Sequence, residues 1–186
     1  MARTSVLLLV LLSACGSGVS STADAQKAYL GLDPSVDRAI TLGFAGFNSA
    51  SSANISPQRT DGGVSGTLTV SGQVDQGASA NKGMRLNEAL SSYSDDGQVT
   101  YSTDPAALPA LTINLKGIPG GTVDGSLNGS FLMSGGLTGQ VSLTLSFAGQ
   151  IEPAADGGTV VRKVGTTRIT GTATSPAGTY NIDVTR

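Results

Sequence analysis

The chain has 186 residues, with 11 basic and 13 acidic side chains and a formal net charge of −2 at pH 7. This charge argues against a nucleic-acid partner, which calls for a basic patch. Histidine and tryptophan are absent, so the usual general base near neutral pH and the commonest zinc ligand are both missing. We therefore expect neither an enzyme nor a metal or other cofactor.

Residues 1–14 have the parts of an export signal. Arg3 supplies the positive start, residues 6–12 form an apolar run, and Ser13 and Ala14 are the small residues that a signal peptidase requires. The apolar run is too short to span a bilayer, which takes about 20 residues. We expect residues 1–14 to be removed from the mature chain.

The run Leu12-Ser13-Ala14-Cys15 resembles the lipobox of bacterial lipoproteins. The resemblance is limited to residues 1–15. It implies that a diacylglyceryl group is transferred to the Cys15 sulfur, since the thiolate is the nucleophile, and that signal peptidase II cleaves between Ala14 and Cys15. The freed amine is then usually acylated, and two or more acyl chains make a stable anchor. Gly16 stands where an Asp would retain such a protein at the inner membrane, so the resemblance favours the outer membrane.

Removal of residues 1–14 would leave 172 residues with a net charge of −3, because Arg3 is lost with the signal. That length suits one domain, which buries about 70% of its unfolded surface. Cys15 is the only cysteine, so a lipidated chain has no disulfide. Residues 16–32 are small and polar, and we expect a flexible tether with a span of about 20 Å. The folded domain is then expected over residues 33–186.

The pair Asp33-Pro34 predicts the start of a helix, with Asp33 as the N-cap and Pro34 in the first helical position. Apolar residues then recur at helical spacing over 34–47, at Val36, Ile40, Phe44 and Phe47. Part of the segment could instead be a strand, because Ile40, Leu42 and Phe44 alternate. We favour the helix, and we expect residues 49–61 to form a loop.

From residue 64 onward the apolar residues recur with a period of two, which is typical of strands with one buried face. The segments with this pattern are 64–74, 84–90, 111–115, 122–133, 137–151, 167–173 and 179–184. Short turn signals between them predict antiparallel hairpins. The sequence therefore predicts a mainly β fold, in which a strongly curved antiparallel meander of about seven to eight strands has one N-terminal helix packed on it.

Glycines recur on the apolar face of these predicted strands. They are Gly66, Gly72, Gly125, Gly129, Gly139, Gly149 and Gly171. Glycine within a strand often marks a bend or the close approach of another element, so the set predicts a curved sheet wrapped around the helix at 34–47. Because glycine also serves bulges, a glycine-rich sheet without that helix contact stays an alternative.

The run Ser79-Ala80-Asn81-Lys82 matches the S-x-x-K nucleophile motif of penicillin-binding proteins and β-lactamases. That family also has S-x-N and K-T-G elements. In this chain Ser94 is followed by Asp95-Asp96, and Lys163 is followed by Val164-Gly165. The isolated motif does not predict catalysis.

Several acidic residues are candidates for other sites. Asp95, Asp96 and Asp104 could offer oxygen ligands to Ca²⁺, but they lack EF-hand spacing, and Asp-Asp-Gly first indicates a turn. Glu88 is in phase with the apolar residues around it, so alternation places it inward. An unpaired buried carboxylate is costly, and we expect a nearby bulge to turn Glu88 outward.

These observations favour a lipid-anchored protein of the cell envelope with a non-catalytic structural or interaction role. An alternative is a carrier that holds a lipid or small apolar ligand on the concave face of the sheet, and a third is a hydrolase without histidine. The expected partners are the membrane, through Cys15, and an envelope protein or an apolar ligand. An open apolar concavity would favour the carrier, and a helix filling it would favour the structural role.

Overall fold

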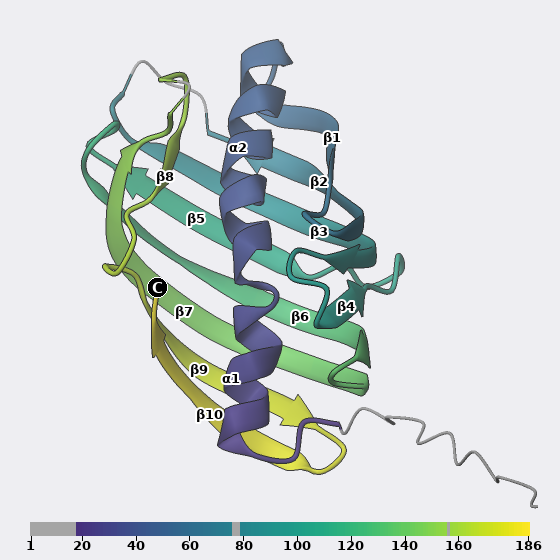
Figure 1. Cartoon of the computed structure of the whole chain (residues 1–186). Coiled ribbons are helices and arrows are strands. Elements are labelled where there is room, and N and C mark those ends of the chain that lie inside the picture. Colours follow the sequence, from purple (N-terminus) through teal and green to yellow (C-terminus); the bar gives the residue numbers. More distant parts are fainter. Residues whose placement is uncertain (1–17, 76–78, 156) are drawn as a thin grey trace, which may run out of the picture.

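The structure, a computed structural model, describes residues 18–75, 79–155 and 157–186. It is mainly β: a ten-stranded antiparallel sheet curves around two consecutive helices that lie across its concave face (Figure 1). This confirms the predicted fold class. The strands are β1 (Asn54–Asp61), β2 (Ser65–Val74), β3 (Lys82–Ser94), β4 (Val99–Ser102), β5 (Ala110–Lys116), β6 (Thr122–Gly135), β7 (Gly139–Pro153), β8 (Val160–Arg162), β9 (Arg168–Ser175) and β10 (Gly178–Thr185).

The sheet is a meander in which neighbouring strands are nearly consecutive along the chain. Its order is β1-β2-β3-β4-β6-β7-β9-β10, while β5 pairs with both β3 and β6, and β8 pairs with β7. The longest pairing joins β6 and β7, from Thr122 opposite Gln150 to Met133 opposite Gly139. Long antiparallel pairs of this kind place every second side chain on the concave face, where the core lies.

Strand β1 occupies residues 54–61 of the segment 49–61, so the predicted loop is wrong there. Ile55 is its one buried residue, so the strand has no apolar alternation that could reveal it. Pro57 lies where the register between β1 and β2 shifts, and proline is tolerated in such an edge strand. Strands β4 and β8 are also additions, and they are too short to display a period of two.

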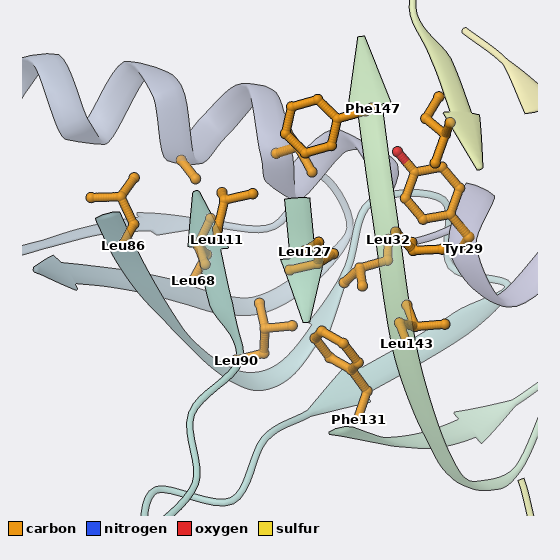
Figure 2. Packing of buried hydrophobic residues seen from close by; sticks show 14 of the residues in the cluster. Tyr29, Leu32, Leu68, Leu86, Leu90, Leu111, Leu127, Phe131, Leu143 and Phe147 are labelled. Carbon is orange, nitrogen blue, oxygen red and sulfur yellow. The ribbon is translucent and has the colours of Figure 1, made fainter. Parts of the chain in front are cut away.

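Helix α2 (Asp33–Ser49) is the predicted helix, with Pro34 in its first turn. Its buried face includes Val36, Ala39 and Ile40, which are fully buried against the sheet. Figure 2 shows a helix above side chains that rise from the strands, among them Leu127, Phe131 and Phe147. The predicted N-cap is wrong, because Leu32 occupies that position and the Asp33 side chain binds elsewhere.

The prediction of a flexible tether over 16–32 is wrong for Thr22–Leu30, which form helix α1. Ser21 caps this helix by accepting a hydrogen bond from the Asp24 amide at 3.1 Å. The Asp24 carboxylate in turn accepts from the Ser20 amide and the Ser21 hydroxyl, an arrangement similar to a capping box. Three side chains on one face of α1 are buried in the core, Ala25, Ala28 and Tyr29.

The junction between the two helices requires a residue without a side chain. A Cβ atom on Gly31 would lie 2.6 Å from the hydroxyl oxygen of Tyr101. That hydroxyl donates a hydrogen bond of 2.7 Å to the carbonyl of Ala28. Gly31 therefore lets β4 hold the end of α1 through a fully buried tyrosine.

The glycines on the apolar face of the strands do not make room for α2, contrary to the prediction. A Cβ atom on Gly129 would lie 2.5 Å from Cα of Pro109, and one on Gly171 would lie 2.1 Å from the carbonyl oxygen of Thr144. Gly171 also has a φ of +147°, a conformation that favours glycine. Except at Gly139, where a Cβ atom would meet nothing within 4 Å, these glycines allow neighbouring strands and loops to approach closely.

The close approach of helix and sheet depends instead on two glycines of α2 itself. A Cβ atom on Gly43 would lie 2.8 Å from the sulfur of Met84, and one on Gly46 would lie 2.9 Å from Cβ of Ile55. The helix does pack closely on the sheet, as predicted, but the glycines that allow this lie on the helix and not on the strands.

The substitution Gly46→Ala should destabilise the protein, although alanine favours a helix by about 1 kcal/mol. The added methyl group would overlap the stiff, β-branched side chain of Ile55, and such overpacking typically costs about 1–3 kcal/mol. Gly43→Ala should cost less, because the thioether of Met84 can move aside. Urea unfolding measures both, with the exposed Thr41→Ala as control; an increase in stability for Gly46→Ala would contradict this packing.

Candidate functional site

A group of charged side chains gathers beside the first turns of α2. It consists of Asp33, Asp37, Arg162 and Arg186, which we name the arginine cluster. The Arg162 side chain, from β8, is only 4% exposed. Its Nη1 lies 2.9 Å from Oδ1 of Asp33, and its Nε lies 2.8 Å from Oδ1 of Asp37. One helical turn separates the two aspartates, so both carboxylates face the same guanidinium.

The protonation states of this cluster are set by its contacts. Burial alone would raise the pKa of Asp33, but the hydrogen bonds and charge of Arg162 outweigh it, and the pKa lies below the ordinary 3.8. The hydroxyl of Tyr29 donates to the same carboxylate, and Nε of Arg186 lies 3.2 Å from it. Burial and the charge of Asp33 raise the pKa of Tyr29. Asp33 therefore stays ionised and Tyr29 neutral around pH 7, which suits neither for proton transfer there.

A cleft of about 360 Å³ opens beside the arginine cluster, with Lys163, Val164 and Thr167 in its wall. Arg162 directs Nε, Nη1 and Nη2 at the two aspartates, and Nη2 also donates to the Asp33 carbonyl. An anion entering the cleft would have to compete with two carboxylates for that guanidinium. The hydrogen bonds of Arg162 therefore connect β8 to α2 and leave the guanidinium engaged by protein groups, which is unlike a preformed ligand site.

A second polar cluster, centred on Asp95, connects α2 to the turn before β2 and to the end of β3. Its carboxylate accepts from Arg38 of α2 at 2.7 Å, from the Gly63 amide at 2.7 Å and from the Tyr93 hydroxyl. The other two candidate calcium ligands accept from nearby amides, Asp96 from Gln98 and Asp104 from Ala106. Among the residues that the structure describes, no three or more His, Cys, Asp or Glu side chains gather as a metal site.

The S-x-x-K segment serves as a structural loop. The Ser79 hydroxyl accepts from the Asn81 amide at 3.1 Å, and the Asn81 side chain accepts from the Gly117 amide at 3.0 Å. The ammonium of Lys82 lies 4.9 Å from the centre of the Phe47 ring, a cation–π distance. These contacts join the start of β3 to the turn after β5 and to the last turns of α2.

Glu88 faces the core, and the predicted outward turn is wrong. The residue is 0% exposed and pairs opposite Val70 in a register that runs without a shift from Thr67 to Val74. No bulge therefore occurs where one was expected. Neither carboxyl oxygen has a hydrogen-bond partner among the described residues, and burial raises the pKa of Glu88 to about 7.

The sequence contained unused signals for the arginine cluster. Arg162 is in phase with Val160, which places it on the buried side of β8, and Asp33 and Asp37 are one helical turn apart. A strand of three residues is too short to make that alternation convincing. The predicted lipidation and cleavage residues, Cys15 and Ala14, lie outside the described residues.

Comparisons with protein-family models, with curated proteins and with solved structures found no match for this chain. Within the described residues, neither helix has the length and apolar character needed to cross a bilayer.

Replacing Arg162 with methionine should lower the free energy of unfolding by about 3–5 kcal/mol, because Asp33 is left as a buried charge without its main partner. The matched control is Arg168→Met, which breaks a pair of similar length, 2.8 Å, whose side chains are 67% and 58% exposed. That variant should change stability little. Urea unfolding at neutral pH compares the two, and equal losses would contradict the assigned role of the arginine cluster.

Glu88 should make the protein less stable as the pH rises from about 4.5 to about 7. Across this window the unfolded state binds fewer protons than the folded state, so stability falls with pH and then levels off. At about 1.4 kcal/mol per pKa unit, the loss amounts to roughly 3 kcal/mol. Glu88→Met should remove this slope and stabilise the protein more at pH 8 than at pH 5. Melting curves across that range test it with Glu152→Met as control; an unchanged slope in Glu88→Met would sink the assignment.

Proposed function

We propose that this chain is a lipid-anchored protein of the cell envelope whose β domain has a non-catalytic structural or interaction role. The run Leu12-Ser13-Ala14-Cys15 carries the proposal, because it resembles a lipobox at the end of an export signal. Cys15 would be acylated and become the first residue of the mature chain. Gly16 at the next position favours the outer membrane.

The state of the titratable side chains supports a non-catalytic role. Asp33 is held as an anion by Arg162, and Glu88 is sealed in the core. The Ser79 hydroxyl is engaged in its own loop, and the chain has no histidine. General acid–base or nucleophilic catalysis needs such a group near a substrate with a suitable pKa, and these contacts do not provide one.

The cover on the concave face supports a structural role over a carrier. An apolar ligand on that face would have to lie where α2 packs, and Val36, Ala39 and Ile40 are fully buried there. Opening the face would expose these side chains and break the contact between Arg38 and Asp95. Because α2 fills the concave face, we expect any partner to bind the outer surface of the domain.

Cys15→Ala should abolish anchoring, because it removes the sulfur that accepts the lipid. The variant should either leave the detergent-soluble membrane fraction or remain unprocessed with residues 1–14 attached. Ser17→Ala, outside the lipobox-like run, is the matched control and should be processed and retained like the parent. Fractionation and intact mass measure both properties. Normal processing and membrane retention of Cys15→Ala would refute the anchoring proposal.

Native mass spectrometry of the protein from its own membranes separates the two non-catalytic roles. A structural or interaction protein should show the acylated mass alone or with a protein partner. A co-purifying apolar small molecule, lost when the domain is unfolded, would place the carrier ahead of the structural role.

A further inference from the structure

The folded domain begins close to the proposed anchor. The backbone is fixed at Val19, which is 1% exposed and whose carbonyl accepts a hydrogen bond of 2.6 Å from the Ser175 hydroxyl. Three residues, 16–18, separate Val19 from Cys15. Four steps of extended chain span at most about 14 Å.

That length is small compared with the membrane surface it must cross. The polar headgroup layer on one side of a bilayer is roughly 5–8 Å thick. If Cys15 carries the lipid, its sulfur sits at the base of this layer, and Val19 then lies within roughly 10 Å of the layer's outer boundary. The predicted tether of 16–32 would have let the domain turn freely, whereas a link of this length does not.

The surface around Val19 has the composition to lie against lipid headgroups. Residues 18–20 line a shared cleft with the turn between β6 and β7 and the turn between β9 and β10. The segments 16–23, 134–140 and 174–179 contain no charged residue, and the charged groups beside them are the Asp24 carboxylate, which accepts from the Ser20 amide and hydroxyl, and the Lys27 ammonium next to Gly136. Pro176 and Ala177 are exposed at the tip of the second turn, and the half-buried Tyr180 donates a hydrogen bond to the Ala177 carbonyl. Such a surface approaches headgroups with few ions to desolvate, the Lys27 ammonium beside Gly136 suits the headgroup phosphates, and tyrosine is favoured at that depth.

We infer that residues 18–20 and the turns at 136–138 and 175–178 form a membrane-facing surface that rests on the phospholipid headgroups. This inference rests on the proposed lipid anchor at Cys15 and adds an orientation to it. The other end of β9 then points away from the membrane. It leads back to Val164, which is 87% exposed, and the seven steps along β9 alone cover roughly 23 Å.

The absence of tryptophan from the chain allows a direct test with single-tryptophan variants. Ala177→Trp and Thr179→Trp place the probe near the inferred membrane-facing surface, and Val164→Trp places it at the far end. The mature chain from Cys15 onward is coupled through its only thiol to maleimide-bearing lipid in phosphatidylcholine vesicles that contain dansyl-labelled phosphatidylethanolamine. Energy transfer from tryptophan to dansyl should be at least about twofold stronger for Ala177→Trp and Thr179→Trp than for Val164→Trp, given the rise of about 3.3 Å per residue between the two ends.

A longer link provides the matched control. Inserting about 20 Gly/Ser residues between Ser17 and Gly18 gives a span of roughly 25 Å and should make the near and far probes transfer equally. Equal or reversed transfer with the natural link, in variants that keep the parent's melting temperature, would overturn the orientation. The maleimide coupling replaces the natural lipid, so energy transfer tests the orientation alone. Acylation of Cys15 is tested separately by the intact mass of the native protein.

Discussion

The whole molecule depends on covering one apolar face of a curved sheet. Alternation along each strand collects the apolar side chains on the concave side, and a sheet with one such face is stable only when another layer buries it. Helices α1 and α2, which follow one another across the strands, form that layer (Figure 1). The burial of apolar surface supplies the free energy, at about 25 cal/mol for each square ångström removed from water.

Polar contacts then decide where the helical layer lies, because burial has no direction of its own. They occur from Val19, three residues before α1, to Arg38 in the first half of α2. Each joins a helix or its flank to a different part of the sheet: Val19 to Ser175, Ala28 to Tyr101, Asp33 to Arg162 and Arg38 to Asp95. Beyond the last of these contacts, Gly43 and Gly46 allow the close approach of α2 to the sheet. The two buried carboxylates differ within this frame, since Asp33 has a cationic partner and Glu88 has none.

Much of the fold could be predicted from sequence because it repeats locally. The period of two from residue 64 onward and the helical spacing over 34–47 each need only one stretch of chain to be seen. Helix α1 was missed because its buried face uses small residues such as Ala25 and Ala28, although Ser21 and Asp24 marked its start. Strand β1 was missed because an edge strand leaves most of its side chains in water.

The polar site was harder to predict, because its members are far apart in sequence. Asp33 has an obvious local role as an N-cap, and nothing nearby reveals that Arg162 competes for it. For Glu88 the local pattern was right, because alternation placed the side chain inward. The cost of an unpaired buried carboxylate argued for an outward turn, but the unbroken pairing of β3 with β2 outweighs that cost.

The sequence separation of these ties also orders the events of folding. Asp33 is 129 residues from Arg162 and 153 from Arg186, and Val19 is 156 from Ser175. When the chain emerges with its N-terminus first, the helices are present before any of these partners exist. Contacts that close such long loops form late, since the chain entropy must be lost before they stabilise anything. Helix α2 can pack on β1, β2 and β3 as soon as these strands form, but α1 and the first turn of α2 are held in place only when β8, β9 and β10 arrive. The first part of the domain to be synthesised is therefore among the last to be fixed.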